Sequence, residues 1–275
     1  KRKNNKTENS VNIYATLVVI NIYIYFIGQL PYVIYFWEGY QVSKKKVSII
    51  IPISFIDSTR KDAFLFVEKY YKKFFPDYEL CIERCDETPF PKSRTINRCV
   101  KKSSGDILII ADADILINPK IIRNSIKLLD YSPWIIPFNE VINIKKESTA
   151  HLLKTTPEWP VPAFLETVKR PFMGHGGINI VPRNYFDQIY GFDERFVGWG
   201  GEDDAFAASL NALCGYVKRL QNSVYHLWHD RQQTGNYNNN VEILKPYLLG
   251  RKSIQNEIQH RKTLANRKEI GKDEN

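Results

Sequence analysis

Residues Ile107–Ile115 read ILIIADADI, an apolar run that ends in two aspartates. A run this apolar and this rich in isoleucine predicts a buried strand over residues 106–111. Asp112 and Asp114 follow this strand at once. Because an open α/β sheet binds its ligands beyond the carboxyl ends of its strands, we expect both carboxylates to project into a binding crevice.

The residues before this strand alternate between strand and helix patterns. Val47–Ser54 (VSIIIPIS) is apolar and β-branched, and it predicts a buried parallel strand. Helices are predicted over 62–75 and 92–103, with a strand over 78–83 between them. Strands that alternate with helices in this way predict an α/β fold with a doubly wound, mostly parallel sheet.

The spacing of Asp112 and Asp114 suits a metal site. Hard oxygen ligands bind Mg²⁺ or Mn²⁺, and either ion neutralises a diphosphate. The alternative is a solvated turn at the strand end, where aspartate is common. The long apolar lead-in and the preceding Gly105-Asp106 favour the metal interpretation.

A second acidic motif lies at Gly191–Asp204, which reads GFDERFVGWGGEDD. Adjacent glycines bring the backbone close to a neighbour or permit a conformation that other residues resist. The three acids that follow open a predicted helix and exceed what its dipole requires, so one of them would suit a general base. Trp199 offers a flat apolar face for a sugar ring, with a core tryptophan as the alternative.

Two of the five histidines, His226 and His229, lie three residues apart after a strand-like stretch. Imidazole binds transition metals such as Mn²⁺, so one of them can complete the site begun by Asp114. A structural histidine is the alternative for either residue. The acidic motif upstream favours the ligand interpretation, for His229 more than for His226.

Together, DADI, the run from GGINIV to WGGEDD, and HLWH resemble a GT-A fold glycosyltransferase. The pattern is similar to family 2 enzymes and to the C-terminal half of the β-1,4-galactosyltransferases, and it covers about Val47 to His229. Phe90–Asn97 (FPKSRTIN) is similar to a looser donor-side pattern of the same family.

The resemblance implies roles for individual residues. Asp114 and His229, with His226, would bind the metal, and Asp203 would be the catalytic base. The acceptor-binding residues would be Trp199, Gly200, Gly201, Glu202 and Asp204. The nucleotide-sugar-binding residues would be Pro52, Ile53, Arg94, Asn97, Asp112, Ala113, Gly176 and Gly177. The galactosyltransferases have Met at the position of His226, and Gly174-His175 do not match the residue that tunes their donor choice.

The implied function is transfer of a sugar, with inversion, from a nucleotide diphosphate sugar such as a UDP-sugar to a hydroxyl of a glycan or another acceptor. Mn²⁺ is the expected cofactor, with Mg²⁺ as the alternative. A degenerate protein that binds sugar nucleotides without turnover stays open. A phosphatase of the DxD type is disfavoured, because the pair follows the third strand and Ile115-Leu116 come next.

Three segments are expected along the chain. Residues 1–46 form a basic and apolar leader, 47–240 the catalytic domain, and 241–275 a polar, helical tail. Within the domain, 47–130 would be the nucleotide-sugar half and 131–240 an acceptor-side subdomain.

The net charge of +9 comes almost entirely from the two ends of the chain. Residues 1–46 carry seven basic against two acidic residues, and 251–275 carry seven against four. The body between them is nearly neutral, which disfavours nucleic acid as a partner. Basic ends fit an anionic membrane surface or solubility equally well.

The leader contains no charged residue from Asn9 to Trp37, and residues 11–37 have the length of a membrane span. Three interpretations stay open: membrane association through this segment, an apolar leader packed on the domain, or a signal-like segment that has no small-residue cleavage site. The expected location is accordingly either membrane-associated or cytoplasmic.

Overall fold

The computed structural model describes residues 45–172, 174–230 and 236–270, with side chains as far as 265. The predicted membrane-associated segment at 11–37 lies outside the described residues. Within the described part of the chain, no helix is both long enough and apolar enough to cross a bilayer.

The first sheet has six strands and is mostly parallel. Its order is β2-β1-β3-β8-β5-β9, and only β8 runs against its neighbours. Two adjacent inner strands, β1 and β3, are buried along their whole length, as their apolar sequences predict. The strands are β1 (Val47–Ile53), β2 (Glu79–Arg84), β3 (Ile107–Ala111), β5 (Ile135–Ile136), β8 (Ile178–Pro182) and β9 (Lys218–Arg219). The predicted α/β class with a mostly parallel sheet is confirmed.

A second sheet of four strands has the order β4-β10-β6-β7. Its strands are β4 (Ile115–Ile117), β6 (Glu140–Ile144), β7 (Thr167–Pro171) and β10 (Ser223–His226). Residues 112–114 connect β3 of the first sheet to β4 of the second. β10 pairs with β4 so that His226 lies opposite Ile115. This register brings the histidine motif to the aspartate motif.

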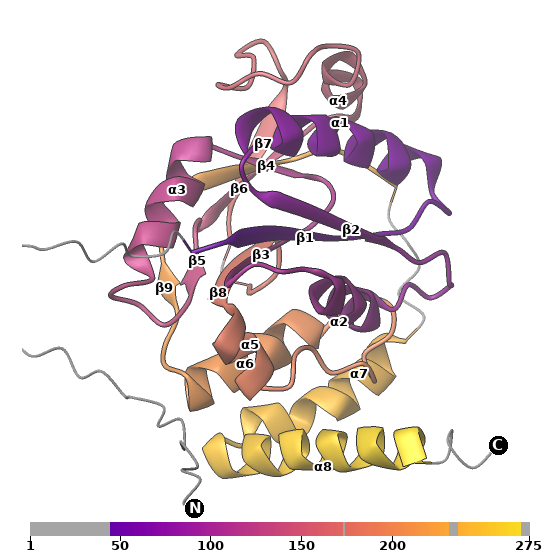
Figure 1. The fold of residues 1–275 in the computed structure, drawn as a ribbon. Coiled ribbons are helices and arrows are strands. Elements are labelled where there is room, and N and C mark those ends of the chain that lie inside the picture. The colour runs from indigo at the N-terminus through magenta and orange to yellow at the C-terminus, as the bar shows by residue number, and fades with distance from the viewer. Residues whose placement is uncertain (1–44, 173, 231–235, 271–275) are drawn as a thin grey trace, which may run out of the picture. The chain divides into compact units, whose positions relative to one another are not determined.

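Helices cover the first sheet on both faces. Figure 1 shows α1 (Ser58–Phe74) on one face and α2 (Lys92–Lys102), α5 (Arg183–Gln188) and α6 (Glu202–Leu213) on the other. The remaining helices are α3 (Pro119–Leu128), α4 (Lys146–Leu152), α7 (Tyr237–Leu244) and α8 (Arg251–Ile270), with the 3₁₀ turn η1 (Lys245–Leu248) between the last two. The described part of the tail contains α7, η1 and α8, and α8 packs against α6 and η1.

Helix α1 begins four residues before the predicted start at residue 62. Asp57 caps it, and its side chain accepts hydrogen bonds from the backbone N–H groups of Thr59 and Arg60. The cap places Arg60 in the first turn of the helix, where it reaches the histidine motif (described below).

Candidate active site

The three predicted metal ligands come together. Asp114 is buried, and its Oδ2 lies 3.0 Å from Nε2 of His229, while its Oδ1 lies 3.7 Å from Nε2 of His226. One ligand atom from each of these residues lies within 4.8 Å of the others. We call Asp114, His226 and His229 the metal group. A carboxylate and two imidazoles are a donor set that Mn²⁺ accepts.

Hydrogen bonding orients His229 for this role. Its Nδ1 lies 2.8 Å from the carbonyl oxygen of Asp230. A carbonyl only accepts, so Nδ1 carries a proton, and Nε2 faces Asp114. In the protonated ring Nε2 donates to that carboxylate, and in the neutral ring it would offer its lone pair to a metal ion. Nη2 of Arg60 lies 3.3 Å from the same Nε2, which brings a permanent positive charge to the edge of the metal group.

The charge balance of the metal group favours an ionised Asp114. Burial by itself would raise the pKa of Asp114, but the neighbouring His226 and His229 outweigh it and hold that pKa well below its usual range. Burial likewise opposes the charged form of His229, and its hydrogen bond to Asp114 still raises the pKa of that imidazole. The group therefore presents a carboxylate ready to bind a cation.

Asp112 belongs to a different set of contacts. Nζ of Lys92, the first residue of α2, lies 3.1 Å from Asp112, 3.4 Å from Glu202 and 2.8 Å from Asp203. Lys92, Asp112, Glu202 and Asp203 form what we call the acidic cluster. It joins the aspartate motif to the first turn of α6, two segments that are about ninety residues apart in the sequence.

Contacts within the acidic cluster and its burial shift the pKa values of Lys92 and Asp203. Burial by itself would lower the pKa of Lys92, but the three carboxylates raise it well above its usual value. Burial raises the pKa of Asp203 to about 7, with Glu202 and Asp112 adding to the rise and Lys92 opposing it. A carboxylate with a pKa near neutrality suits a general base.

Gly176 and Gly177 line the cluster where a side chain would not fit. A Cβ on Gly176 would collide with Oδ2 of Asp203, so a side chain at this position would displace that carboxylate. Gly177 has a φ of +98°, and its carbonyl accepts a hydrogen bond of 2.8 Å from the N–H of Asp112. Gly176 thus lies against Asp203, and Gly177 is hydrogen-bonded to Asp112, so this segment contacts both acidic motifs.

Trp199 lies on the surface beside α6, with 64% of its area exposed. Its ring stacks on that of Tyr237 at a centroid distance of 5.8 Å, and the side-chain amide of Asn240 donates to the Trp199 carbonyl. Gly200 and Gly201 follow with φ values of +106° and +92°, a backbone that favours glycine. An exposed aromatic face next to the acidic cluster suits the apolar face of a sugar.

Other predicted site residues have different partners. Asp204 accepts from His175, whose Nδ1 lies 2.7 Å from its Oδ1. Arg94 pairs with Glu87. The side-chain amide of Asn97 donates to the Phe192 carbonyl and to Glu194, and its oxygen accepts from the Phe192 N–H. The predicted nucleotide contacts of Arg94 and Asn97 thus compete with these pairs.

Pro52, Ile53 and Ala113 are buried in the described structure. Pro52 and Ile53 end β1, at the carboxyl edge of the first sheet where a ligand is expected, and the Ile53 carbonyl accepts from the Cys85 N–H. Ala113 lies between Asp112, which contacts Lys92 of the acidic cluster, and Asp114, which belongs to the metal group.

Sequence reasoning missed Lys92, Arg60 and His175. For Lys92 a signal was present, because it is a cation at the first residue of a predicted helix, where the helix dipole disfavours positive charge. A lysine or arginine at such a position indicates an anionic partner from elsewhere in the chain. Arg60 lies before the predicted start of its helix at residue 62, so no such signal marked it. His175 carried no comparable signal.

Comparison with solved structures shows similarity to several glycosyltransferases. The catalytic domain of Drosophila β1,4-galactosyltransferase 7, in complex with xylobiose, is 20% identical and has a TM-score of 0.43, with 74% of this chain and 80% of that chain covered. Glucosyl-3-phosphoglycerate synthase from Mycobacterium tuberculosis, in complex with Mn²⁺, UDP-glucose and phosphoglyceric acid, is 12% identical with a TM-score of 0.48 and coverage of 77% and 80%. A mannosyltransferase from Pyrobaculum calidifontis, in complex with GDP-mannose and Mn²⁺, is 15% identical with a TM-score of 0.42 and coverage of 78% and 65%.

A search of curated proteins finds no match to this chain. A family model described as the N-terminal domain of galactosyltransferase matches residues 167–230. This segment runs from β7 through α6 to the residue after His229. The resemblance to the galactosyltransferases that the sequence predicts is confirmed over residues 167–230.

Proposed function

We propose that this chain is a GT-A glycosyltransferase that transfers a sugar from a nucleotide diphosphate sugar to an acceptor hydroxyl, with a divalent cation as cofactor. The observation that carries the proposal is the meeting of the metal group and the acidic cluster on one short loop, residues 112–114. One side of this loop offers a cation site for a diphosphate, and the other side offers a base. The family match over residues 167–230 supports the same reading.

The metal group would bind Mn²⁺ through Asp114, His226 and His229. Bound there, the ion supplies positive charge for the diphosphate that departs from the donor. Arg60 adds a second positive charge at the same edge and would contact the diphosphate. UDP-sugars are the first donors to test, because the similar β1,4-galactosyltransferase 7 is also solved with UDP-galactose and manganese.

Asp203 would accept the proton of the acceptor hydroxyl while that oxygen forms its bond to the anomeric carbon of the donor. The bond from the anomeric carbon to the diphosphate breaks in the same step, so the configuration inverts. Lys92 keeps the three carboxylates of the acidic cluster close together despite their mutual repulsion. Trp199 would cover the acceptor sugar, with Glu202 next to its reacting hydroxyl.

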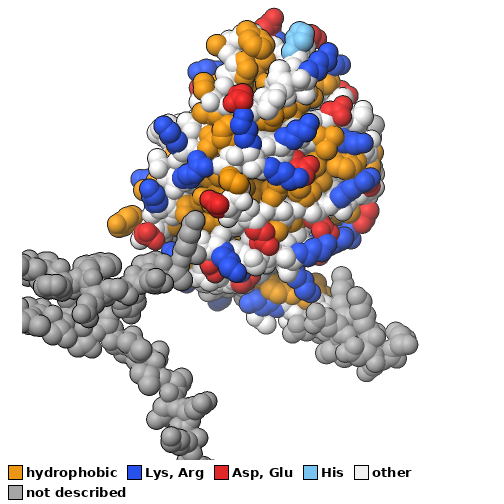
Figure 2. Space-filling view, turned by 45° about the horizontal axis from the view of Figure 1, so that its top comes forward, with side chains coloured by type: hydrophobic (Ala, Val, Ile, Leu, Met, Phe, Trp, Pro, Cys, Tyr) orange, Lys and Arg blue, Asp and Glu red, His pale blue; other side chains and the backbone are white. Residues whose placement is uncertain are grey.

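The near-neutral charge of residues 47–250, with 25 basic and 24 acidic residues, disfavours nucleic acid as the ligand. On the face shown in Figure 2, lysines and arginines are interspersed with acidic residues and apolar side chains. A nucleic-acid surface would gather its basic residues on one face of the folded body.

The test is a panel of UDP- and GDP-sugars, each incubated with Mn²⁺ and with mono- and disaccharide acceptors that include xylobiose. We expect one donor to be consumed, a glycosylated product to appear in the mass spectrum, and EDTA to stop the reaction. Asp114→Ala should lose the same activity, whereas Glu158→Gln, a change at an exposed acid that pairs with Lys73, should keep it.

Two other outcomes would argue against the proposal. Binding of UDP with Mn²⁺ but no turnover of any donor would indicate a degenerate protein that binds sugar nucleotides. Absence of both metal-dependent binding and turnover would remove the proposed function altogether.

A further inference from the structure

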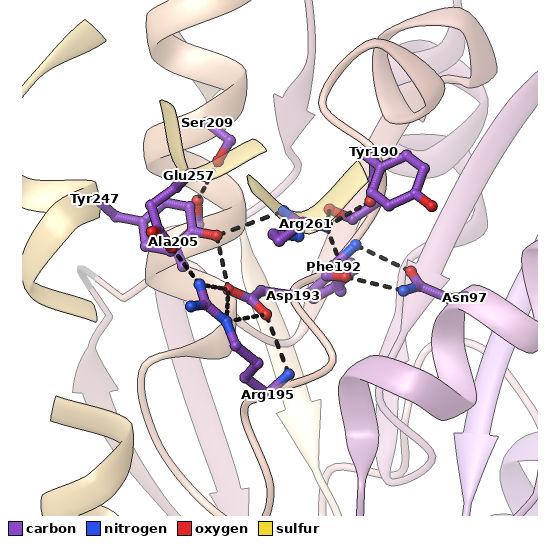
Figure 3. Close-up of polar contacts among 11 residues, drawn as sticks. Asn97, Tyr190, Phe192, Asp193, Arg195, Ala205, Ser209, Tyr247, Glu257 and Arg261 are labelled. Carbon is purple, nitrogen blue, oxygen red and sulfur yellow. Dashed lines mark hydrogen bonds and ion pairs between the residues drawn. The ribbon is translucent and has the colours of Figure 1, made fainter. Parts of the chain in front are cut away.

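The tail that follows the histidine motif holds the segment that leads into the acidic cluster. We define residues 190–201 as the acceptor loop, since they end at Trp199 and the two glycines before α6. Helices α7 and α8, with η1 between them, contact this loop at several points along its length. Figure 3 shows the largest of these contacts, in which Arg261, Glu257 and Tyr247 from the tail surround Asp193 and Phe192 of the loop.

Arg261 fixes the start of the loop through its backbone. This side chain is only 8% exposed. Its Nη2 donates to the carbonyls of Gly191 and Phe192 at 3.1 and 2.9 Å, and also to that of Tyr190. Tyr190 and Gly191 have φ values of +62° and +60°, so the chain turns sharply at the point where the guanidinium holds it.

Asp193 ties the same stretch to the tail through its side chain. It is buried, and its Oδ2 accepts from the hydroxyl of Tyr247 at 2.8 Å. Arg195 also donates to Asp193, through Nε at 3.0 Å and Nη2 at 2.6 Å, and it pairs with Glu257 of α8. A buried ionic network of this kind is expensive to desolvate, and it gains more in fixing a single conformation than in stability.

The far end of the loop is held by α7. The side-chain amide of Asn240 donates to the carbonyls of Val197 and Trp199 at 3.2 and 3.3 Å. Tyr237 stacks on Trp199. From the opposite side, Asn97 of α2 binds both polar atoms of the Phe192 backbone, so the loop lies between the tail and the helix that carries Lys92.

We propose that the C-terminal tail is a positioning element of the acceptor site, and that Arg261 is the residue through which α8 sets the acceptor loop. The proposal rests on the proposed function, in which the loop presents Trp199 to the acceptor and leads directly into Glu202 and Asp203 at the start of α6. The proposed metal ligands and the diphosphate contact of Arg60 lie elsewhere, on α1, the 112–114 loop and the segment from β10 to His229. Loss of Arg261 should therefore damage acceptor use while donor and metal binding persist.

The experiment compares Arg261→Met, Arg261→Lys and the control Lys252→Met, a change at an exposed residue of the same helix. With the donor selected by the panel, Arg261→Met should lower kcat/KM for the acceptor on the order of 10- to 100-fold, because small misplacements of reacting groups are costly. Mn²⁺-dependent binding of UDP and hydrolysis of the donor without acceptor should stay within about twofold of the wild type. Arg261→Lys should recover part of the loss, and Lys252→Met should show none.

Hydrogen exchange gives a readout that needs no activity. Amides of residues 190–201 should exchange faster in Arg261→Met than in the wild type or in Lys252→Met, while those of β1 and β3 stay protected. Unchanged exchange of the loop amides in Arg261→Met would overturn the proposal. So would a loss of donor hydrolysis in this variant that equals its loss of transfer to the acceptor. If Arg261→Met does not fold, Glu257→Gln tests the same loop through Arg195, with the same outcomes. A wild-type chain that turns over no donor would contradict the proposed function, and hydrogen exchange would still decide the role of Arg261.

Discussion

The metal group and the acidic cluster have different balances of charge, although Asp114 of the one and Asp112 of the other are only two residues apart in the sequence. In the metal group, one carboxylate faces two imidazoles and the guanidinium of Arg60, and the pKa of Asp114 is held well below its usual range. In the acidic cluster, three carboxylates share the single ammonium of Lys92, and the pKa of Asp203 rises to about 7. Two aspartates of one site are thus prepared for different tasks, one as a ligand and the other as a base.

The largest effect on transfer activity is expected at Asp203, the proposed base of the acidic cluster. Asp203→Asn keeps the shape of the side chain but removes its ability to take a proton. Transfer should fall on the order of 10²- to 10⁴-fold, the usual contribution of general base catalysis. Titration calorimetry should find unchanged affinity for Mn²⁺ with UDP. Transfer at the wild-type rate by a folded Asp203→Asn variant would refute the assignment of the base.

The next effect concerns Asp114. Asp114→Asn should weaken Mn²⁺ binding by about 100-fold or more, since even an indirect partner of a metal ligand is worth 10- to 100-fold. Manganese paramagnetic resonance measures the free ion directly. Asp112→Asn is the matched control, because Asp112 contacts Lys92 and belongs to the acidic cluster. Equal losses in both variants would mean that the two groups are not separate.

Within the metal group, His226 and His229 are expected to contribute unequally to Mn²⁺ binding. Its Nε2 is 3.7 Å from Asp114, against 3.0 Å for His229. His226→Gln should therefore cost about tenfold in Mn²⁺ affinity, less than His229→Gln. The same titration in both variants checks the order. A larger loss at His226 would reverse the ranking of the two ligands.

The smallest predicted effect is at Trp199. Trp199→Ala removes an exposed ring, so stability should change little, while the loss of one stacking contact should raise KM for the acceptor about three- to tenfold. Steady-state kinetics with varied acceptor measures this change. Tyr131→Ala, at another exposed aromatic residue, is the control. A rise in the KM for the donor instead would place the ring on the other side of the site.

Much of this arrangement follows from local sequence patterns. The buried strands β1 and β3 and the aspartates at the end of β3 follow from apolar runs with a polar end. The histidine motif was predicted from its spacing together with the acidic motif upstream, and the pairing of β10 with β4 supplies the contact with Asp114. These residues are close because strand ends meet at the edges of sheets.

Other features depend on contacts between distant segments. Lys92 and Asp203 are far apart in the chain, and only the packing of α2 beside α6 brings them to 2.8 Å. Asn97, which is predicted to contact the nucleotide, binds the backbone of Phe192, a contact between segments about 95 residues apart. The helical tail was predicted as an element, but its sequence did not indicate that Arg261 would bind three carbonyls of the acceptor loop.

The pH profile of transfer by the wild type and Lys92→Met tests the central claim most directly. A base must be deprotonated to act, so kcat/KM of the wild type should fall as the pH drops through about 7, the pKa of Asp203. Without the ammonium, the carboxylates lose their only partner within the cluster, and the midpoint should move upward by about one pH unit or more. Lys92→Arg should keep it near the wild-type position. A profile that is flat from acid to alkaline pH, or a midpoint that Lys92→Met leaves in place, would contradict the account.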